Sequence, residues 1–299
     1  MAKIKVICTS TGCIEYAPER YRKHDIDIIH ILVNFKGVEY HDGLDLDPAK
    51  FYAELETLEN PKDNLPRTAI PPRAEVEACF ERAISEGYDE AIVVALSSYL
   101  GGTYNFIRLV AKDFEDRLKV HVVDAKITSF GEGLLAIQAA ELAAKGADST
   151  SILKELEWSI AHQELFGVDA KLDYLIYNGR LKGGKALMGK MLNICPVVHF
   201  NKEGELCALQ SVRTPKKALT RTCEILKEML GDRDSADYIL FHVYTGPSLL
   251  EDLKEIEKKY DIVTNHEPVI FSPVAGAHNG PWMAGYGLLF LRREDEPLT

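Results

Sequence analysis

One stretch of this chain combines residue types that could hold an anion: residues 91–104, AIVVALSSYLGGTY. Its apolar, β-prone start predicts a strand buried on both faces, and hydroxyl side chains and glycines follow at once. Apolar side chains with helical spacing resume from Tyr104, so the glycines stand where backbone N–H groups of a helix N-terminus can approach a ligand. The chemistry that this predicts is the binding of a carboxylate or phosphate by Ser97, Ser98, Gly101, Gly102 and Thr103.

This turn is not one of the common nucleotide-binding motifs. It lacks the lysine of G-x-x-x-x-G-K-[ST], and no G-x-G-x-x-G follows a strand elsewhere in the chain. The six cysteines are dispersed without C-x-x-C spacing and lie mostly in apolar runs, so we expect buried free thiols. The nine histidines form no H-x-x-x-H pair. We therefore expect no metal site and no cofactor.

Charge and hydropathy narrow the classes of partner. The chain has 299 residues, with 35 lysines and arginines against 46 acidic residues, which gives a net charge of −11. No basic cluster is present to follow a nucleic-acid backbone, so nucleic acid is not an expected partner. The first ten residues lead directly into a strand pattern, and no apolar segment reaches ~18 residues. We expect a cytoplasmic protein without a membrane-spanning segment.

Strand and helix patterns alternate through the first half of the chain. This order predicts a doubly wound parallel sheet. Ligands in such folds lie outside the carboxyl ends of the strands, so residues 9–11, 97–103 and 124–129 should converge on one crevice. That places Ser10 and Thr11 beside the glycine-rich turn. The expected strands are 4–8, 27–33, 91–96 and 120–123; the expected helices are 18–24, one from Pro48 with Asp47 as its N-cap, 72–86, 104–114 and 130–145.

The second half has a mixed pattern, which predicts a separate α/β domain with a mixed sheet. We place the boundary between residues 1–160 and 161–299, and expect the two domains to pack closely because no low-complexity linker separates them. The expected helices are one that starts near 149, then 172–177, 186–194, 215–229 and 247–259; the expected strands are 197–200, 206–212, 238–243, 262–263 and 285–291, with an apolar run over 269–274.

Several short motifs occur in an order that resembles the DegV family. The resemblance covers essentially the whole chain, and its specificity comes from the ordered set of pieces. They are IKVICTST (4–11), HDGLDLDPAKFYAEL (41–55), PRTAIPP (66–72), SSYLGGTYN (97–105), VVDAK (122–126), YNGRLKG (177–183), SVRTPKKAL (211–219) and AHNGP (277–281).

The resemblance implies a fold and a function. Members of this family bind fatty acids, and some are the acyl-carrying subunits of bacterial fatty acid kinases. The family fold has two α/β domains with one lipid between them, and the lipid carboxylate lies at the turn described above. For this chain the resemblance implies a non-catalytic protein that binds a long-chain fatty acid. Its partner would be a fatty acid kinase that supplies ATP and metal.

The resemblance also implies roles for individual residues. Thr68 matches the threonine of the family's T-S-Q-P, which hydrogen-bonds the lipid carboxylate, and Ser97 and Ser98 match the paired serines of S-S-x-L-S-G-T. Arg180 matches the arginine of G-G-R, Arg213 that of V-R-T, and His278 the histidine of A-H-x-G-x-G. In the kinase systems these arginines and the histidine lie near the carboxylate end of the lipid.

This chain departs from the family pattern at the head-group end. The D-S-T near the N-terminus is Thr9-Ser10-Thr11 here, T-S-Q-P is 68–71 (TAIP), and the serine of S-G-T is Gly101. One of the two hydroxyls expected on the carboxylate is therefore missing. Backbone N–H groups of Gly101 and Gly102 can replace it at the helix N-terminus, a contribution of ~1 kcal/mol.

Energetics favour a lipid over a small anion. One carboxylate held by hydroxyls and amides contributes only a few kcal/mol after desolvation, whereas ~15 buried methylenes contribute up to ~12 kcal/mol. Two apolar stretches are candidates to line a tunnel, with ordinary core packing as the alternative for each residue. They are Phe130, Leu134, Leu135 and Ile137, and residues 187–194.

Two other classes of function remain open from the residues. A serine hydrolase or acyltransferase could use Ser98 or Ser10 as nucleophile and His278 as base, although no G-x-S-x-G is present. A small-anion-binding or nucleotide-binding domain would instead have a polar crevice. Structural roles are open as well, since Thr103 could cap its helix and Arg180 could be a surface ion-pair partner.

Overall fold

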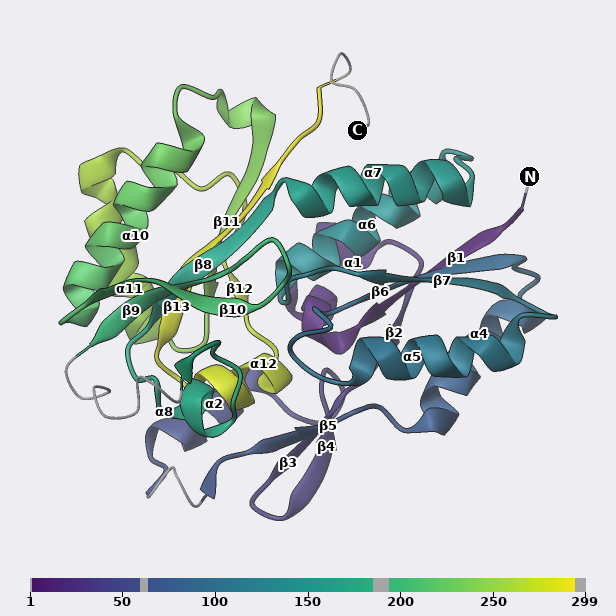
Figure 1. Cartoon of the computed structure of the whole chain (residues 1–299), viewed down its shortest axis with the longest axis horizontal. Helices are drawn as coiled ribbons and strands as arrows, with labels where there is room; N and C mark the ends of the chain where they lie inside the picture. Colours follow the sequence, from purple (N-terminus) through teal and green to yellow (C-terminus); the bar gives the residue numbers. More distant parts are fainter. Residues whose placement is uncertain (1, 60–63, 185–193, 294–299) are drawn as a thin grey trace.

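The computed structural model describes residues 2–59, 64–184 and 194–293. Figure 1 shows two large sheets side by side and a small third sheet near the junction; helices cover both faces of the parallel sheet and the outer face of the other large sheet. Among the described residues, no helix is both long and apolar enough to cross a bilayer. All six cysteines are free thiols, as expected, and only Cys207 is partly exposed.

The first sheet is the parallel sheet that the sequence predicts. Its strands have the order β2-β1-β6-β7, and each neighbouring pair is parallel. The inner strands β1 and β6 are buried along almost their whole length, because helices cover both faces. The strands are β1 (Ile4–Thr9), β2 (Ile26–Ile29), β6 (Glu90–Ala95) and β7 (Lys119–Asp124).

Helices pack on both faces of this sheet. One face contacts α4 and α5 through Phe80 and Ile107, and the other contacts α6 and α7 through Leu135 and Ile152. This arrangement confirms the doubly wound fold. The helices are α4 (Arg73–Ser85), α5 (Thr103–Ala111), α6 (Phe130–Ala144) and α7 (Ser149–Ala161).

The second sheet is mixed, as predicted. Its order is β10-β9-β8-β13-β11-β12, and all pairs are antiparallel except β11 with β12. Helices α10 (Pro215–Leu230) and α11 (Pro247–Glu257) pack on its outer face. The strands are β8 (Gln163–Asp169), β9 (Cys195–Phe200), β10 (Leu206–Val212), β11 (Tyr238–Tyr244), β12 (Val269–Ile270) and β13 (Met283–Phe290).

The inner face of the mixed sheet shares a core with the first half of the chain. Phe130 of α6 stacks edge-to-face on Phe241 of β11 with 5.2 Å between ring centroids. The same cluster includes Leu96 after β6, Leu165 of β8 and Met283 of β13. The domain boundary near residue 160 stays a prediction; it falls in the last turn of α7, immediately before β8.

A third, three-stranded sheet corrects one prediction. The single strand expected over 27–33 is two strands, β2 and β3, in different sheets. The chain leaves the parallel sheet at Ile31, because the Ile31 N–H donates to Ser10 Oγ and the Ile31 carbonyl accepts from the Asp42 N–H. The third sheet consists of β3 (Leu32–Phe35), β4 (Val38–His41) and β5 (Arg67–Ala69), in the antiparallel order β4-β3-β5.

Other differences lie in the second half. Strand β8 had no counterpart among the predictions, and the strand expected over 262–263 is absent, since the Ile262 N–H bonds back to the end of α11. The apolar run at 269–274 becomes β12 followed by α12 (Pro273–Asn279), a helix that Ser272 caps by accepting from the Ala275 N–H. The expected helix over 186–194 lies almost entirely outside the described residues.

The remaining elements are short. Helix α2 begins as predicted, with the Asp47 carboxylate accepting from the Lys50 N–H. The short elements are α1 (Glu19–Arg22), α2 (Pro48–Glu56), α8 (Asp173–Tyr177), and the 3₁₀ turns η1 (Ser10–Gly12), η2 (Ile14–Tyr16), η3 (Lys112–Phe114), η5 (Ser235–Asp237) and η6 (Lys258–Tyr260).

Candidate functional site

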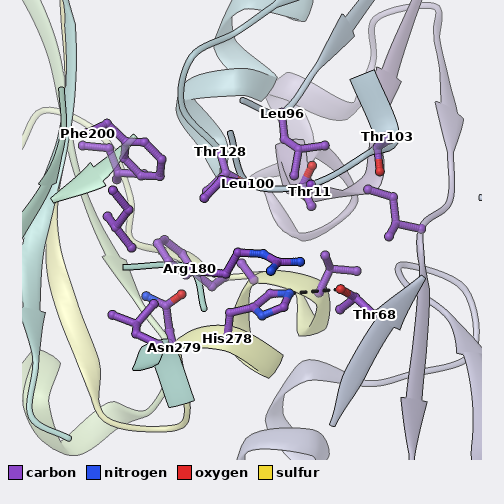
Figure 2. Close-up of a pocket in the computed structure, with 18 of the residues that line it drawn as sticks. Thr11, Thr68, Leu96, Leu100, Thr103, Thr128, Arg180, Phe200, His278 and Asn279 are labelled. Carbon is purple, nitrogen blue, oxygen red and sulfur yellow. Dashed lines mark hydrogen bonds between the residues drawn. The ribbon is translucent and has the colours of Figure 1, made fainter. Parts of the chain in front are cut away.

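A cavity lies where the carboxyl ends of the parallel strands face the mixed sheet. About 860 Å³ of space free of protein atoms lies between its walls, and part of this space is open to solvent. Its wall is mostly apolar and comes from β5, β8, β9, the turn after β6, and α12. Figure 2 shows side chains from both sheets pointing into this space.

The N-terminus of α5 opens into the cavity. Gly101, Gly102 and Thr103 line it, and Gly102 caps the helix without a side-chain hydrogen bond to the first turn. The first N–H groups of α5 therefore lack a side-chain acceptor and carry the positive end of the helix dipole. Thr103 is the first helical residue rather than the cap. This end of the cavity suits an anion.

Thr68 and His278 meet at the same end. Thr68 Oγ1 lies 3.0 Å from His278 Nε2, and this contact joins β5 to α12 (Figure 2). Burial, together with the charges of Arg180 and Arg67, lowers the pKa of His278 to about 3, so the imidazole is neutral at physiological pH. Its Nδ1 is buried and has no hydrogen-bond partner among the described residues. The tautomer with hydrogen on Nε2 leaves no buried N–H unsatisfied, and it leaves the Thr68 proton free for a ligand.

Two arginines add positive charge beside this pair. Arg180 is half-buried and lines the cavity, and one of its terminal nitrogens donates to the Asn178 carbonyl at 2.9 Å. Its Nε has no partner in the residues that the structure describes. Arg67 donates to the Asn178 side-chain oxygen at 2.7 Å. Burial and the charge of Arg67 lower the pKa of Arg180. Within the described part of the chain, the hydrogen bonds of both guanidinium groups go to Asn178 and not to a carboxylate.

The two serines of the glycine-rich turn have structural partners. Ser97 is buried, and its hydroxyl donates to the Gly204 carbonyl at 2.6 Å, which ties the turn to the β9–β10 hairpin. The Ser98 N–H donates to Asp124 at 3.2 Å, and Asp124 also accepts from the Lys126 N–H at 3.0 Å. Neither serine lines the cavity. Their predicted contact with a ligand therefore has no support from the geometry.

The remaining predicted residues divide between cavity and surroundings. Thr11 lines the cavity, whereas Ser10 is buried behind it with its oxygen accepting from the Ile31 N–H. Arg213 is exposed just after β10 and does not line the cavity. The structure thus brings together Thr11, Thr68, Gly101, Gly102, Thr103, Arg180 and His278, and leaves Ser10, Ser97, Ser98 and Arg213 outside.

The apolar wall differs from the predicted one. Phe130, Leu134, Leu135 and Ile137 pack in the protein core and do not line the cavity. Residues 187–193 of the second predicted stretch lie outside the described residues. The wall instead includes Leu165, Val198, Phe200, Leu206 and Met283.

Sequence reasoning missed Arg67 and Asn279. Arg67 directly precedes the predicted Thr68, and Asn279 directly follows the predicted His278. Adjacency to these predicted site residues is the feature of the sequence that could have identified them. Thr128 lies in the loop expected at the crevice, and it does line the cavity.

The geometry gives the hydrolase alternative little support. His278 Nε2 is engaged by Thr68, and neither Ser10 nor Ser98 lines the cavity. No serine–histidine hydrogen bond joins these groups among the described residues. Those residues also contain no group of three or more His, Cys, Asp or Glu side chains arranged to hold a metal ion.

Comparisons with known proteins agree with this architecture. The DegV protein of Bacillus subtilis is 30% identical over 284 residues, which cover 94% of this chain and 97% of that protein. A DegV domain-containing protein of Listeria innocua is also 30% identical, with coverage of 95% and 97%.

Solved structures match over nearly the whole chain. A fatty acid binding DegV family protein from Streptococcus agalactiae has a TM-score of 0.86 at 28% identity, covering 98% of this chain and 100% of that one. The structure of DegV from Bacillus subtilis, described as a fatty acid binding protein, has a TM-score of 0.81 at 28% identity, with coverage of 97% and 100%. The family model described as "Uncharacterised protein, DegV family" matches residues 3–291. The chain belongs to the DegV family.

Proposed function

We propose that this protein binds one long-chain fatty acid in the cavity, with the carboxylate between Thr68 and the N-terminus of α5. The observation that carries the proposal is the division of the cavity into one polar end and an otherwise apolar wall. The polar end offers a hydroxyl, uncapped helix N–H groups and Arg180, which has no acidic partner within the described residues. Related structures described as fatty acid binding support the same ligand class.

The two parts of the cavity have different energetic roles in this proposal. A hydrogen bond to a charged group contributes about 1.5–3 kcal/mol. Each buried methylene contributes about 0.8 kcal/mol, so the methylenes of a C16 chain together contribute more to the affinity than the hydrogen bonds to the carboxylate. The polar end therefore orients the lipid, and the apolar wall sets the preferred chain length. A small anion would gain only the first contribution.

We further propose that the protein is a non-catalytic cytoplasmic carrier that presents its lipid to a fatty acid kinase. Arg180 lies beside the proposed carboxylate position, where its positive charge would offset negative charge as an acyl phosphate forms, whereas the neutral His278 acts there through its hydrogen bond with Thr68. Arg213 is exposed and outside the cavity, which suits contact with a partner protein better than contact with the lipid. ATP and metal would come from the kinase.

The test is mass spectrometry of the purified protein under native and then denaturing conditions, followed by thermal unfolding with fatty acids of increasing length. We expect one co-purifying long-chain fatty acid per chain, and stabilisation that grows with chain length. Leu206→Ala should reduce this stabilisation because Leu206 lines the cavity, whereas Leu209→Ala is the matched control on the exposed side of the same strand. A ligand-free protein stabilised by phosphate, and not by fatty acids, would refute the proposal in favour of a small-anion site.

A further inference from the structure

A buried carboxyl group lies directly behind the polar end of the cavity. Glu132, in the first turn of α6, is fully buried. Its two oxygens lie 3.1 and 2.9 Å from Thr11 Oγ1, and one of them also accepts from Thr9 Oγ1. Thr11 lines the cavity, so one side chain separates this carboxyl group from the ligand space. None of the roles described above uses Glu132.

Within the part of the chain that the structure describes, no lysine, arginine or histidine side chain forms an ion pair with this group. The titratable groups that act on it are Cys8 of β1, Cys13 between η1 and η2, and Asp42 after β4. Burial raises the pKa of both thiols, and it raises the pKa of Asp42 to about 7. Burial likewise raises the pKa of Glu132 to about 8. Among the described residues, the surroundings of Glu132 therefore favour its neutral form.

The hydroxyl groups of Thr9 and Thr11 couple the protonation state of Glu132 to the hydrogen bonds that the cavity wall can donate. Thr9 Oγ1 and Thr11 Oγ1 are 2.9 Å apart, and each hydroxyl has a single proton to donate. If Glu132 is neutral, it donates to Thr9, Thr9 donates to Thr11, and the Thr11 proton is free. If Glu132 is ionised, both threonines donate to it, and the cavity wall gains a negative charge that repels an anion.

We propose that Glu132 is a positioning residue for the fatty-acid site, and that the cavity holds a carboxylate only while Glu132 carries its proton. The inference rests on the proposed function and adds to it a coupling between lipid binding and proton uptake. Lipid release would be favoured at alkaline pH. The bound carboxylate in turn would raise the affinity of Glu132 for its proton, because lipid binding and proton binding are thermodynamically linked.

The test is the affinity for palmitate, measured by displacement of a fluorescent fatty acid between pH 6 and pH 9.5. We expect the wild-type affinity to fall about tenfold between pH 7 and pH 9, since only the protonated fraction is competent. Glu132→Gln keeps a donor to the threonines and cannot ionise, so it should bind as at low pH throughout the range. Asp42→Asn is the control for the second buried acid, and it should retain the alkaline loss.

Calorimetry of the wild-type protein gives a second measurement that needs no variant. At pH 8, palmitate binding in two buffers of different ionisation enthalpy should reveal net proton uptake. A wild-type affinity that is independent of pH would overturn the inference while leaving the proposed function intact. An alkaline loss that persists in Glu132→Gln, or a Glu132→Gln protein that folds and binds poorly at every pH, would also overturn it. Absence of palmitate binding at every pH would overturn both proposals.

Discussion

Replacing Thr68 with valine removes one hydroxyl while preserving the shape of the side chain. In the structure Thr68 Oγ1 lies 3.0 Å from Nε2 of the neutral, buried His278. This hydroxyl accepts the hydrogen bond from His278, so its own proton is free for a ligand carboxylate. A hydrogen bond to a charged acceptor contributes about 1.5–3 kcal/mol, so Thr68→Val should weaken fatty-acid binding by about 10- to 150-fold. The N-terminus of α5 and Arg180 remain, so binding should not be abolished.

The assay is isothermal titration with saturated fatty acids of different lengths. For the wild type, the binding free energy should rise by about 0.8 kcal/mol per methylene until the cavity is filled. Thr68→Val should give a parallel line displaced to weaker binding, because the tail contacts are unchanged. Thr68→Ser keeps the hydroxyl and should stay close to the wild type. Coincident lines for the wild type and Thr68→Val, or a change of slope instead of an offset, would refute the assignment of Thr68 to the carboxylate.

Three further predictions concern neighbouring residues. Ser97→Ala should lower the free energy of unfolding by about 1–2 kcal/mol, because the buried Gly204 carbonyl loses its partner; denaturant unfolding measures this, and an unchanged stability with a large loss of lipid affinity would show that Ser97 is a ligand contact instead. Arg180→Met should weaken palmitate binding about five- to tenfold at low salt, through loss of a partly buried charge; the difference should shrink at high salt, and an equal loss at both would contradict an electrostatic role. Gly280→Ala should destabilise the fold by more than about 1 kcal/mol, because Gly280 has φ +74° and a Cβ there would lie 2.6 Å from the Tyr174 ring; thermal unfolding tests this, and a stability equal to that of the wild type would contradict it.

The elements around the site differ in how well local sequence predicts them. The β6 turn and α5 were predicted closely, because an apolar run, two glycines and helical spacing are all local features. The division of 27–33 into β2 and β3 was not, since it depends on Ser10 and Asp42 accepting and donating hydrogen bonds from distant positions. Likewise α12 replaced an apolar run because Ser272 caps a helix that packs between the two halves.

Side-chain roles were harder to predict than backbone elements. Ser97 and Ser98 match a motif, yet the first bonds Gly204 and the second presents its N–H to Asp124. The apolar residues of α6 have the composition of a lipid-binding wall, but the helix turns them into the core. Composition and spacing do not tell which face of a buried helix borders a cavity.

The parallel sheet, the mixed sheet, the glycine-rich turn and the family are all predictable from the amino-acid sequence. Each depends on local periodicity or on an ordered set of motifs, and both can be recognised without knowledge of tertiary contacts. The contact of Thr68 with His278, 210 residues away, and the position of Glu132 behind Thr11 are apparent only in the folded chain. Such hydrogen bonds and cavities form between segments that are distant in the chain, so their partners become defined only when the two sheets pack together.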